Sequence, residues 1–185
     1  MDLFSDLAVL IERIARVVQN DTFADDLKPT QWEALRYLSK ANRFSCTPKA
    51  LTSYLGVTKG TVSQSINALE RKGMIVKKTI SSDKRLVNLS LTTKGKKLLK
   101  NDPLDEINNA ASKMTKPQQA DLKKGLKTLL VNTLNERERK PFGACKTCKY
   151  FQKNAEEGSP HHCGLLEVSL SAEDSEKICF EQKFS

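Results

Sequence analysis

Several residue types on which enzymes commonly depend are scarce in this 185-residue chain. It contains two histidines, one tryptophan and only 6% aromatic residues. The sequence shows no glycine-rich dinucleotide loop and no Ser-His-Asp constellation, so we expect no enzyme. Most of the few aromatic residues lie outside the basic segment described below. This distribution disfavours an RNA-binding module, which usually offers aromatic side chains for base stacking.

Long apolar runs are also missing. Residues 3–18 are apolar only in part, because Asp6, Glu12 and Arg13 interrupt them, and no small-residue cleavage site follows. No stretch approaches the roughly 18 uninterrupted apolar residues that a membrane span needs. The sequence therefore predicts a soluble, cytoplasmic protein. In such a reducing compartment the five cysteines indicate metal or redox chemistry rather than disulfides.

Positive charge is concentrated in the middle of the chain. Between Lys28 and Lys100 there are 16 Lys and Arg residues against three acidic ones, a formal charge of +13. Because the whole chain carries +9, the remaining residues sum to −4. A basic middle with mildly acidic flanks is the electrostatic pattern of a segment that binds a polyanion. A generic solvated surface would give the same charge, so the charge alone does not decide.

The spacing of apolar residues predicts a mainly α fold with a small β-hairpin. We expect helices over residues 3–18, 29–38, 48–55, 59–72, 93–99 and 117–134. Two strands are expected over 74–80 and 86–91, joined by a turn at 81–85. Thr47 and Thr58 have the form of N-caps, and Gly56 ends the helix between them. The composition changes near residue 140, which predicts two domains, 1–137 and 138–185.

Helix, tight turn, helix and hairpin in this order describe a winged helix-turn-helix. Its second helix would lie in the major groove of DNA, with residues near its N-terminus facing the base edges. With Val62, Ile66 and Leu69 turned inward, the predicted outward set is Lys59, Thr61, Ser63, Gln64, Ser65 and Asn67. Gln and Asn pair bidentately with adenine, and Ser and Thr contact bases or phosphates. An exposed polar helix face is also common without DNA, so the surrounding architecture carries this interpretation.

Residues 29–38 read PTQWEALRYL, residues 47–73 read TPKALTSYLGVTKGTVSQSINALERKG, and residues 81–95 read SSDKRLVNLSLTTKG. These three stretches resemble the MarR family of bacterial regulators. The last matches the family's wing, in which an Asp, and an Arg two residues later, precede a strand that ends in L-T-x-x-G. The resemblance covers most of residues 1–137. It implies that Arg85 reaches the minor groove and that Asp83 orients it; Lys84, between them, completes the predicted DNA-binding set.

The same resemblance implies a homodimer made by the N-terminal helix and the last long helix. Apolar stripes over residues 3–18 and 122–134 both need a surface against which to bury, either in a second chain or against each other. A two-fold dimer would place two reading heads about one DNA turn apart. We therefore expect a transcriptional regulator, a repressor, that binds double-stranded DNA at a pseudo-palindromic operator. A small-molecule effector is left open.

The C-terminal segment carries four of the five cysteines in the pattern C-x2-C-x14-C-x15-C, at Cys145, Cys148, Cys163 and Cys179. Because this segment lacks the apolar mass to fold alone, we expect it to be a small Cys-rich, metal-bound module. Structural zinc usually takes two close ligand pairs, and only the first pair is close here. Lone, widely separated thiolates suit a cubane better, so a [4Fe–4S] cluster is favoured and Zn²⁺ is the alternative.

The CKTCKYF start and the cysteine spacing also resemble high-potential iron–sulfur proteins, which bind a [4Fe–4S] cluster. We carry over their ligand pattern and not their electron-transfer role. A cluster joined directly to the helix over 117–134 is expected to sense redox or metal state by changing the spacing of the reading heads. The competing interpretations are a purely structural zinc and an electron-transfer protein with an incidental helix-turn-helix. His161 and His162 are either ligand replacements or surface residues, and Cys46 is a buried small residue or a redox-sensing thiol.

Overall fold

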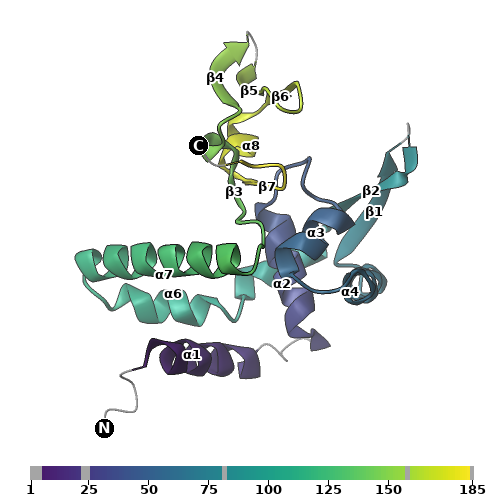
Figure 1. The fold of residues 1–185 in the computed structure, drawn as a ribbon. Coiled ribbons are helices and arrows are strands. Elements are labelled where there is room, and N and C mark those ends of the chain that lie inside the picture. Colours follow the sequence, from purple (N-terminus) through teal and green to yellow (C-terminus); the bar gives the residue numbers. More distant parts are fainter. Residues whose placement is uncertain (1–5, 22–25, 81–82, 157–158, 184–185) are drawn as a thin grey trace.

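The structure is a computed structural model that describes residues 6–21, 26–80, 83–156 and 159–183, with the backbone alone for residues 19–21, 80, 83–86, 156 and 159. The structure has three parts (Figure 1). The first is a helical layer made of helices that precede and follow the second part, a winged helix-turn-helix. The third part is a small C-terminal module. The predicted α+β class, mainly helical with a β-wing, is confirmed.

The winged helix-turn-helix, which we name the head, is built from four helices and one hairpin. Its elements are α2 (Pro29–Lys40), α3 (Pro48–Leu55), α4 (Lys59–Arg71), β1 (Ile75–Ile80), β2 (Asp83–Leu91) and α5 (Thr93–Leu98), followed by a 3₁₀ turn at Leu99–Asn101. Thr47 and Thr58 cap α3 and α4 by accepting hydrogen bonds from backbone amides. Gly56 ends α3 with φ of 64°, a left-handed conformation that a side chain would resist. These local signals confirm the helix boundaries expected from the sequence.

The hairpin differs from its expected form at one end. Strands β1 and β2 pair antiparallel from Ile75 opposite Leu91 to Ile80 opposite Asp83, with a register shift between Thr79 and Ile80. The sequence placed residues 81–85 in the turn, but the strand already begins at Asp83. The prediction is wrong there because the register shift lets Ile80 pair with Asp83. This leaves two residues between the paired positions, the commonest hairpin connection.

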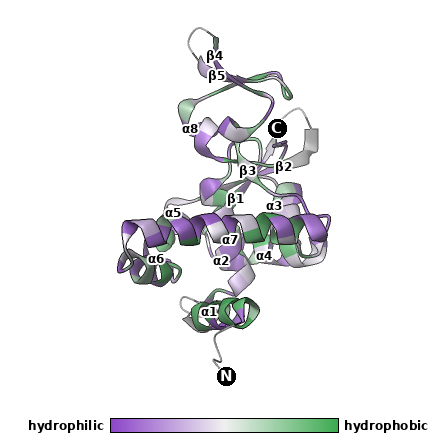
Figure 2. Ribbon diagram, turned by 60° about the vertical axis from the view of Figure 1, so that its left-hand side comes forward, coloured by the Kyte–Doolittle hydropathy of each residue, from purple (hydrophilic) through white to green (hydrophobic). Residues whose placement is uncertain are grey.

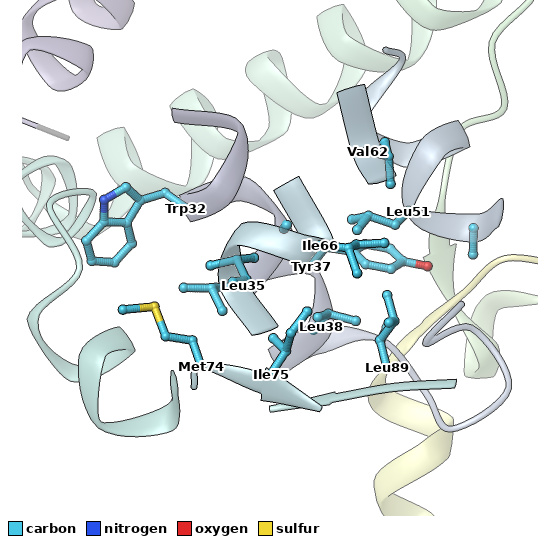
Figure 3. Packing of buried hydrophobic residues seen from close by; sticks show 14 of the residues in the cluster. Trp32, Leu35, Tyr37, Leu38, Leu51, Val62, Ile66, Met74, Ile75 and Leu89 are labelled. Atoms are coloured by element: carbon cyan, nitrogen blue, oxygen red, sulfur yellow. The ribbon is translucent and has the colours of Figure 1, made fainter. Parts of the chain in front are cut away.

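The core of the head lies between α2, α3, α4 and the hairpin (Figure 3). Its largest fully buried side chains include Trp32, Tyr37, Leu51, Ile75 and Leu89, each at most 1% exposed. Together with Val62 and Leu69 of α4, they join α2, α3, α4 and both strands in one core, which fixes how α4 and the wing sit relative to each other. The inward stripe expected on α4 is confirmed by the burial of Val62, Ile66 and Leu69.

A helical layer lies beside the head. It consists of α1 (Leu7–Asp21), α6 (Asp105–Ser112) and α7 (Lys116–Glu136), which lie roughly alongside one another (Figure 1). Neither α6 nor α7 buries a single residue in the isolated chain. Large apolar side chains of α1 and α7 stand in solvent, among them Leu7, Ile14, Leu126 and Leu130, and apolar colour runs along α1 in Figure 2. The layer thus presents unburied apolar surface.

The C-terminal module is a set of short strands, turns and one short helix. Its elements are β3 (Gly143–Ala144), a 3₁₀ turn at Cys145–Thr147, β4 (Phe151–Glu156), β5 (Ser159–Cys163), β6 (Val168–Leu170), α8 (Ala172–Glu176) and β7 (Ile178–Cys179). Strands β4, β5 and β6 form one antiparallel sheet, and β3 pairs with β7. Ile178 and Phe180 pack against the core of the head, and Phe44 of the head packs against the module. The module is therefore docked on the head.

In the part of the chain that the structure describes, no helix is both long and apolar enough to cross a membrane.

Candidate functional sites: the reading helix and the cysteine pocket

Helix α4 presents a polar face to solvent near its N-terminus. Of the residues predicted to face outward, five are exposed: Lys59, Thr61, Ser63, Gln64 and Asn67. The cap residue adds a hydroxyl to this face, because Thr58 Oγ1 accepts from the Thr61 amide at 3.2 Å and lies 2.9 Å from Thr61 Oγ1. Short polar side chains next to unpaired N-terminal amides make a surface to which a phosphate backbone can come close.

The prediction that Ser65 lies on this exposed face is wrong. Ser65 is only 7% exposed and lies in the buried stripe of α4. The reason is geometric: Ser65 stands three residues after Val62 and four before Leu69, and positions three or four apart share one side of a helix. The buried stripe is therefore wider than the apolar residues alone indicate. Ser65 is a packing residue and cannot face a base.

The C-terminal end of the reading face is tied to the wing. Lys77 of β1 donates to Asn67 Oδ1 at 2.7 Å and forms an ion pair with Glu70 at 2.7 Å. The hydrogen bond occupies one of the amide's acceptor positions and holds Asn67 in a defined orientation. The polar side chains of α4 thus form a surface continuous with the first strand of the hairpin.

The wing residues predicted to contact DNA lie on β2. The backbone of Asp83, Lys84 and Arg85 belongs to that strand, at the hairpin end far from the core. Their side chains lie outside the described residues, so the predicted Arg85 contact with the minor groove stays a prediction. On β1, the exposed Lys77 and Lys78 add positive charge to the same hairpin.

The second site is a pocket in the C-terminal module where the four predicted ligands meet. Cys145, Cys148, Cys163 and Cys179 all line it. Cys145 begins the 3₁₀ turn, and Cys148 closes it with a backbone hydrogen bond of 2.9 Å. Cys163 ends β5, and Cys179 ends β7 opposite Gly143. Three separate segments therefore bring the four thiols to one place, while none of them is in a disulfide.

The thiols are shielded from water and surrounded by hydrogen-bond donors. Cys145, Cys163 and Cys179 are buried, and Cys148 is half-buried. The hydrogen bond between Cys145 and Cys179, followed by burial, raises the pKa of Cys145, and the same bond lowers the pKa of Cys179. Asn42 of the head donates its side-chain amide to Cys145 Sγ at 3.1 Å, and the Lys183 amide points at Cys148 Sγ at 3.4 Å. Such donors stabilise thiolates and tune metal–sulfur centres.

The geometry of the pocket bears on what it can hold. Among the described residues, no three His, Cys, Asp or Glu side chains converge closely enough to hold a single metal ion. A tetrahedral zinc needs all its sulfurs about 2.3 Å from one point, whereas a cubane gives each sulfur its own iron. The open space between the thiols is small, ≈ 10 Å³, which by itself favours a small ion. Rotation of the thiols changes both this volume and the distances between the sulfurs, so the donor set, four cysteines, is the feature that fits a metal–sulfur centre.

The remaining candidate residues lie outside this pocket. His161 and His162 are on β5, where the ring of His161 packs on Phe151 at 4.8 Å and His162 Nε2 lies 3.3 Å from Glu167 Oε2. Neither is among the residues that line the cysteine pocket. Cys46 is half-buried against the core of the head, its thiol 3.3 Å from the Asn42 carbonyl, and burial raises its pKa. This environment fits the packing interpretation of Cys46.

Sequence reasoning missed the residues of the head that receive the module. Asn42 is 1% exposed and contacts Cys145, and Arg43 forms an ion pair with Asp174 of α8. Ser45 Oγ accepts from the Phe180 amide at 2.7 Å. The one available signal was a short, mostly polar run, N-R-F-S, between two helices that otherwise follow a clear apolar pattern. That run is typical of any loop, so it did not indicate a docking site.

The head is similar to known regulators. Residues 25–86 match the model of the MarR family. A curated relative, the HTH-type transcriptional repressor YetL of Bacillus subtilis (strain 168), is 26% identical over 96 residues, which are 52% of this chain. The chain spans 58% of the length of that relative.

Solved structures show the same fold. The S. aureus MepR–DNA complex is 25% identical, with a TM-score of 0.58, and is matched over 69% of this chain and 98% of its own. Streptococcus pneumoniae FabT in complex with DNA is 28% identical, with a TM-score of 0.56, over 70% of this chain and 93% of its own. Both matches leave nearly a third of this chain uncovered.

Proposed function

We propose that the chain, whose head matches the MarR family model over residues 25–86, is a DNA-binding transcriptional regulator. The observation that carries the proposal is the exposed polar N-terminal face of α4, rigidly joined to a basic hairpin by the shared core and by the contacts of Lys77. This arrangement supplies base-reading side chains and phosphate-binding charge on one surface. The relatives named as a repressor or solved in complex with DNA support the same function.

Binding-site enrichment on random duplex DNA tests this proposal. Gln64→Ala and Asn67→Ala should change the preferred base at one position each, because amide side chains read adenine. Lys59→Ala should weaken binding to all sequences about equally and reduce the salt dependence. The exposed Asn132 of α7 offers a matched control, since Asn132→Ala removes the same amide from a helix outside the head. Enrichment of no sequence by the wild-type protein would contradict the proposal.

We further propose that the regulator is a homodimer that acts as a repressor at a pseudo-palindromic operator. The support is the unburied apolar surface of α1 and α7, which the isolated chain leaves in solvent. A second copy would cover it and set two reading heads side by side, and the two-fold symmetry of the operator follows from that of the protein. A wing contact by Arg85 in the minor groove completes the proposal, with a loss of about 1–3 kcal/mol expected for Arg85→Ala.

For the cysteine pocket we propose a [4Fe–4S] cluster held by Cys145, Cys148, Cys163 and Cys179. The support is that four cysteines from three segments, none of them in a disulfide, line one pocket. The apolar side chains around the pocket, including Phe151 and Leu170, would keep water from the cluster. Its redox state or its presence is then the signal that the regulator senses.

Anaerobic purification followed by iron, sulfide and zinc analysis tests the cluster. We expect about four iron and four sulfide per chain and a brown protein. Cys148→Ser should lose most of the iron, because Cys148 is a half-buried ligand whose replacement leaves the fold of the buried three in place. Cys46→Ser is the matched control, since it removes the fifth thiol and should keep full iron content. A colourless protein with one zinc per chain would refute the cluster.

A further inference from the structure

The loop between α2 and α3, residues 41–46, is the place where the cysteine module meets the head. We name it the connector. Ala41 forms a parallel bridge with Ile178, and the Asn42 amide donates to the Ile178 carbonyl at 2.9 Å. The side-chain amide of Asn42 donates to Cys145 Sγ at 3.1 Å. A ligand thiol and the strand that bears Cys179 are thus both bonded to one buried asparagine.

The other side of the connector is bonded to the wing. The Leu89 amide of β2 donates to the Cys46 carbonyl at 2.7 Å, and Asn88 Nδ2 donates to the Arg43 carbonyl at 3.3 Å. Within the connector, Asn42 Oδ1 accepts from the Phe44 amide at 3.1 Å. A short series of hydrogen bonds therefore leads from a pocket sulfur through Asn42 and the connector backbone to the strand that carries the predicted DNA-contacting residues.

We propose that the connector transmits the state of the cysteine pocket to the wing, with Asn42 as the positioning residue. This inference rests on the proposed cluster. With a cluster bound, the sulfur of Cys145 would be held in one position, where it accepts from the Asn42 side-chain amide at 3.1 Å. Without the cluster, the Cys145 side chain would be free to rotate, and the bond that orients Asn42 would be lost.

The consequence reaches DNA through a rigid path. Asn42 is 1% exposed and cannot exchange its lost partner for water without opening the interface between module and head. The connector is then free to shift, and with it the backbone bond from Leu89 to Cys46, so the wing loses its fixed orientation. A signal that acts in this way changes operator affinity by the difference between the two states, typically about 5- to 150-fold.

Hydrogen exchange at the Leu89 amide tests the connector without DNA. In the wild-type protein, removal of the cluster should speed exchange at Leu89 while amides of α7 keep their rates. In Asn42→Ala, compared at equal iron occupancy, the Leu89 amide should exchange at one rate whether or not the cluster is bound. Operator affinity should follow the same pattern, falling 5- to 150-fold on cluster loss in the wild type and changing little in the variant.

A second variant guards against a folding defect, because Asn42 is buried. Asn88→Ala removes one connector contact from the wing side, at a residue that does not line the cysteine pocket, so it should reduce the coupling while the cluster persists. Asn132→Ala is again the matched control. Protein that binds no iron would overturn the cluster and this inference together. If the protein binds the cluster but its Leu89 exchange rate and its operator affinity do not change on cluster loss, the proposed role of the connector alone is wrong.

Discussion

Truncation of a leucine on α7 measures how much the helical layer contributes to the proposed dimer. Leu126 is 47% exposed and Leu130 is 59% exposed in the isolated chain. Full burial of a leucine side chain stabilises by roughly 1.5–3 kcal/mol, so covering the exposed half contributes about 1 kcal/mol. In a two-fold dimer each position is buried twice, which gives about 2 kcal/mol per substitution. Leu130→Ala should therefore raise the dimer Kd roughly 30-fold.

Sedimentation equilibrium over a range of protein concentrations measures this change directly. Val76→Ala provides the matched control, because Val76 is also an exposed apolar residue, 40% exposed, but lies on β1 of the head. We expect its dimer Kd to equal that of the wild type. The double variant of Leu126 and Leu130 should be about 4 kcal/mol weaker if the two positions act independently. The reasoning fails if Leu130→Ala and Val76→Ala dimerise equally well.

Two further predictions concern the stability of the head. Gly95→Ala should destabilise it by more than 1 kcal/mol in urea unfolding, because an added Cβ would lie 2.3 Å from the Met74 carbonyl oxygen; Gly125→Ala on α7, with no atom within 4 Å of such a Cβ, should be neutral or stabilising. Burial tends to raise the pKa of Asp102, but hydrogen bonds of 2.6 and 2.7 Å from Arg36 outweigh it and hold that pKa below its usual value. A carboxyl group whose pKa is lowered by folding stabilises the folded protein at pH values above its unfolded pKa of about 4, and this stabilisation is lost as the pH falls through its folded pKa. Asp102→Asn should therefore lower the free energy of unfolding by about 1–2 kcal/mol at pH 7 and by little near pH 2.

The parts of the fold that sequence predicted are those with local signals. Thr47 and Thr58 indicate the starts of helices, and Gly56 indicates the end of one, each within a few residues of the helix boundary. The alternation of apolar and polar residues on β2 likewise identified Leu89 as buried. The burial of Ser65 was not predicted, because it depends on the width of the buried stripe on α4. The elements packed against α4 set that width, and the sequence of the helix alone does not.

Contacts between distant segments account for what could not be predicted. The spacing of the four cysteines indicated a shared site, and the structure places all four around one pocket. Nothing in that spacing indicates where the module docks. The bond from Asn42 to Cys145 joins residues 103 positions apart, and neither residue carries a periodic or capping signal for it. Such contacts depend on the complementarity of two surfaces that form only once both parts have folded. A single sequence carries no local signal for that complementarity.

The docking position decides between two routes from the cysteine pocket to DNA. The chain order, with the module directly after α7, suggested a signal that tilts the dimer helix and changes the distance between the reading heads. The contacts instead join the pocket to the connector and wing of the head. A change in head spacing has no effect on one isolated half-site, whereas a change in wing orientation alters every half-site. Cluster loss should therefore weaken binding to a half-site duplex as well as to the full operator. A half-site affinity that is identical with and without the cluster, beside a changed full-site affinity, would assign the signal to α7.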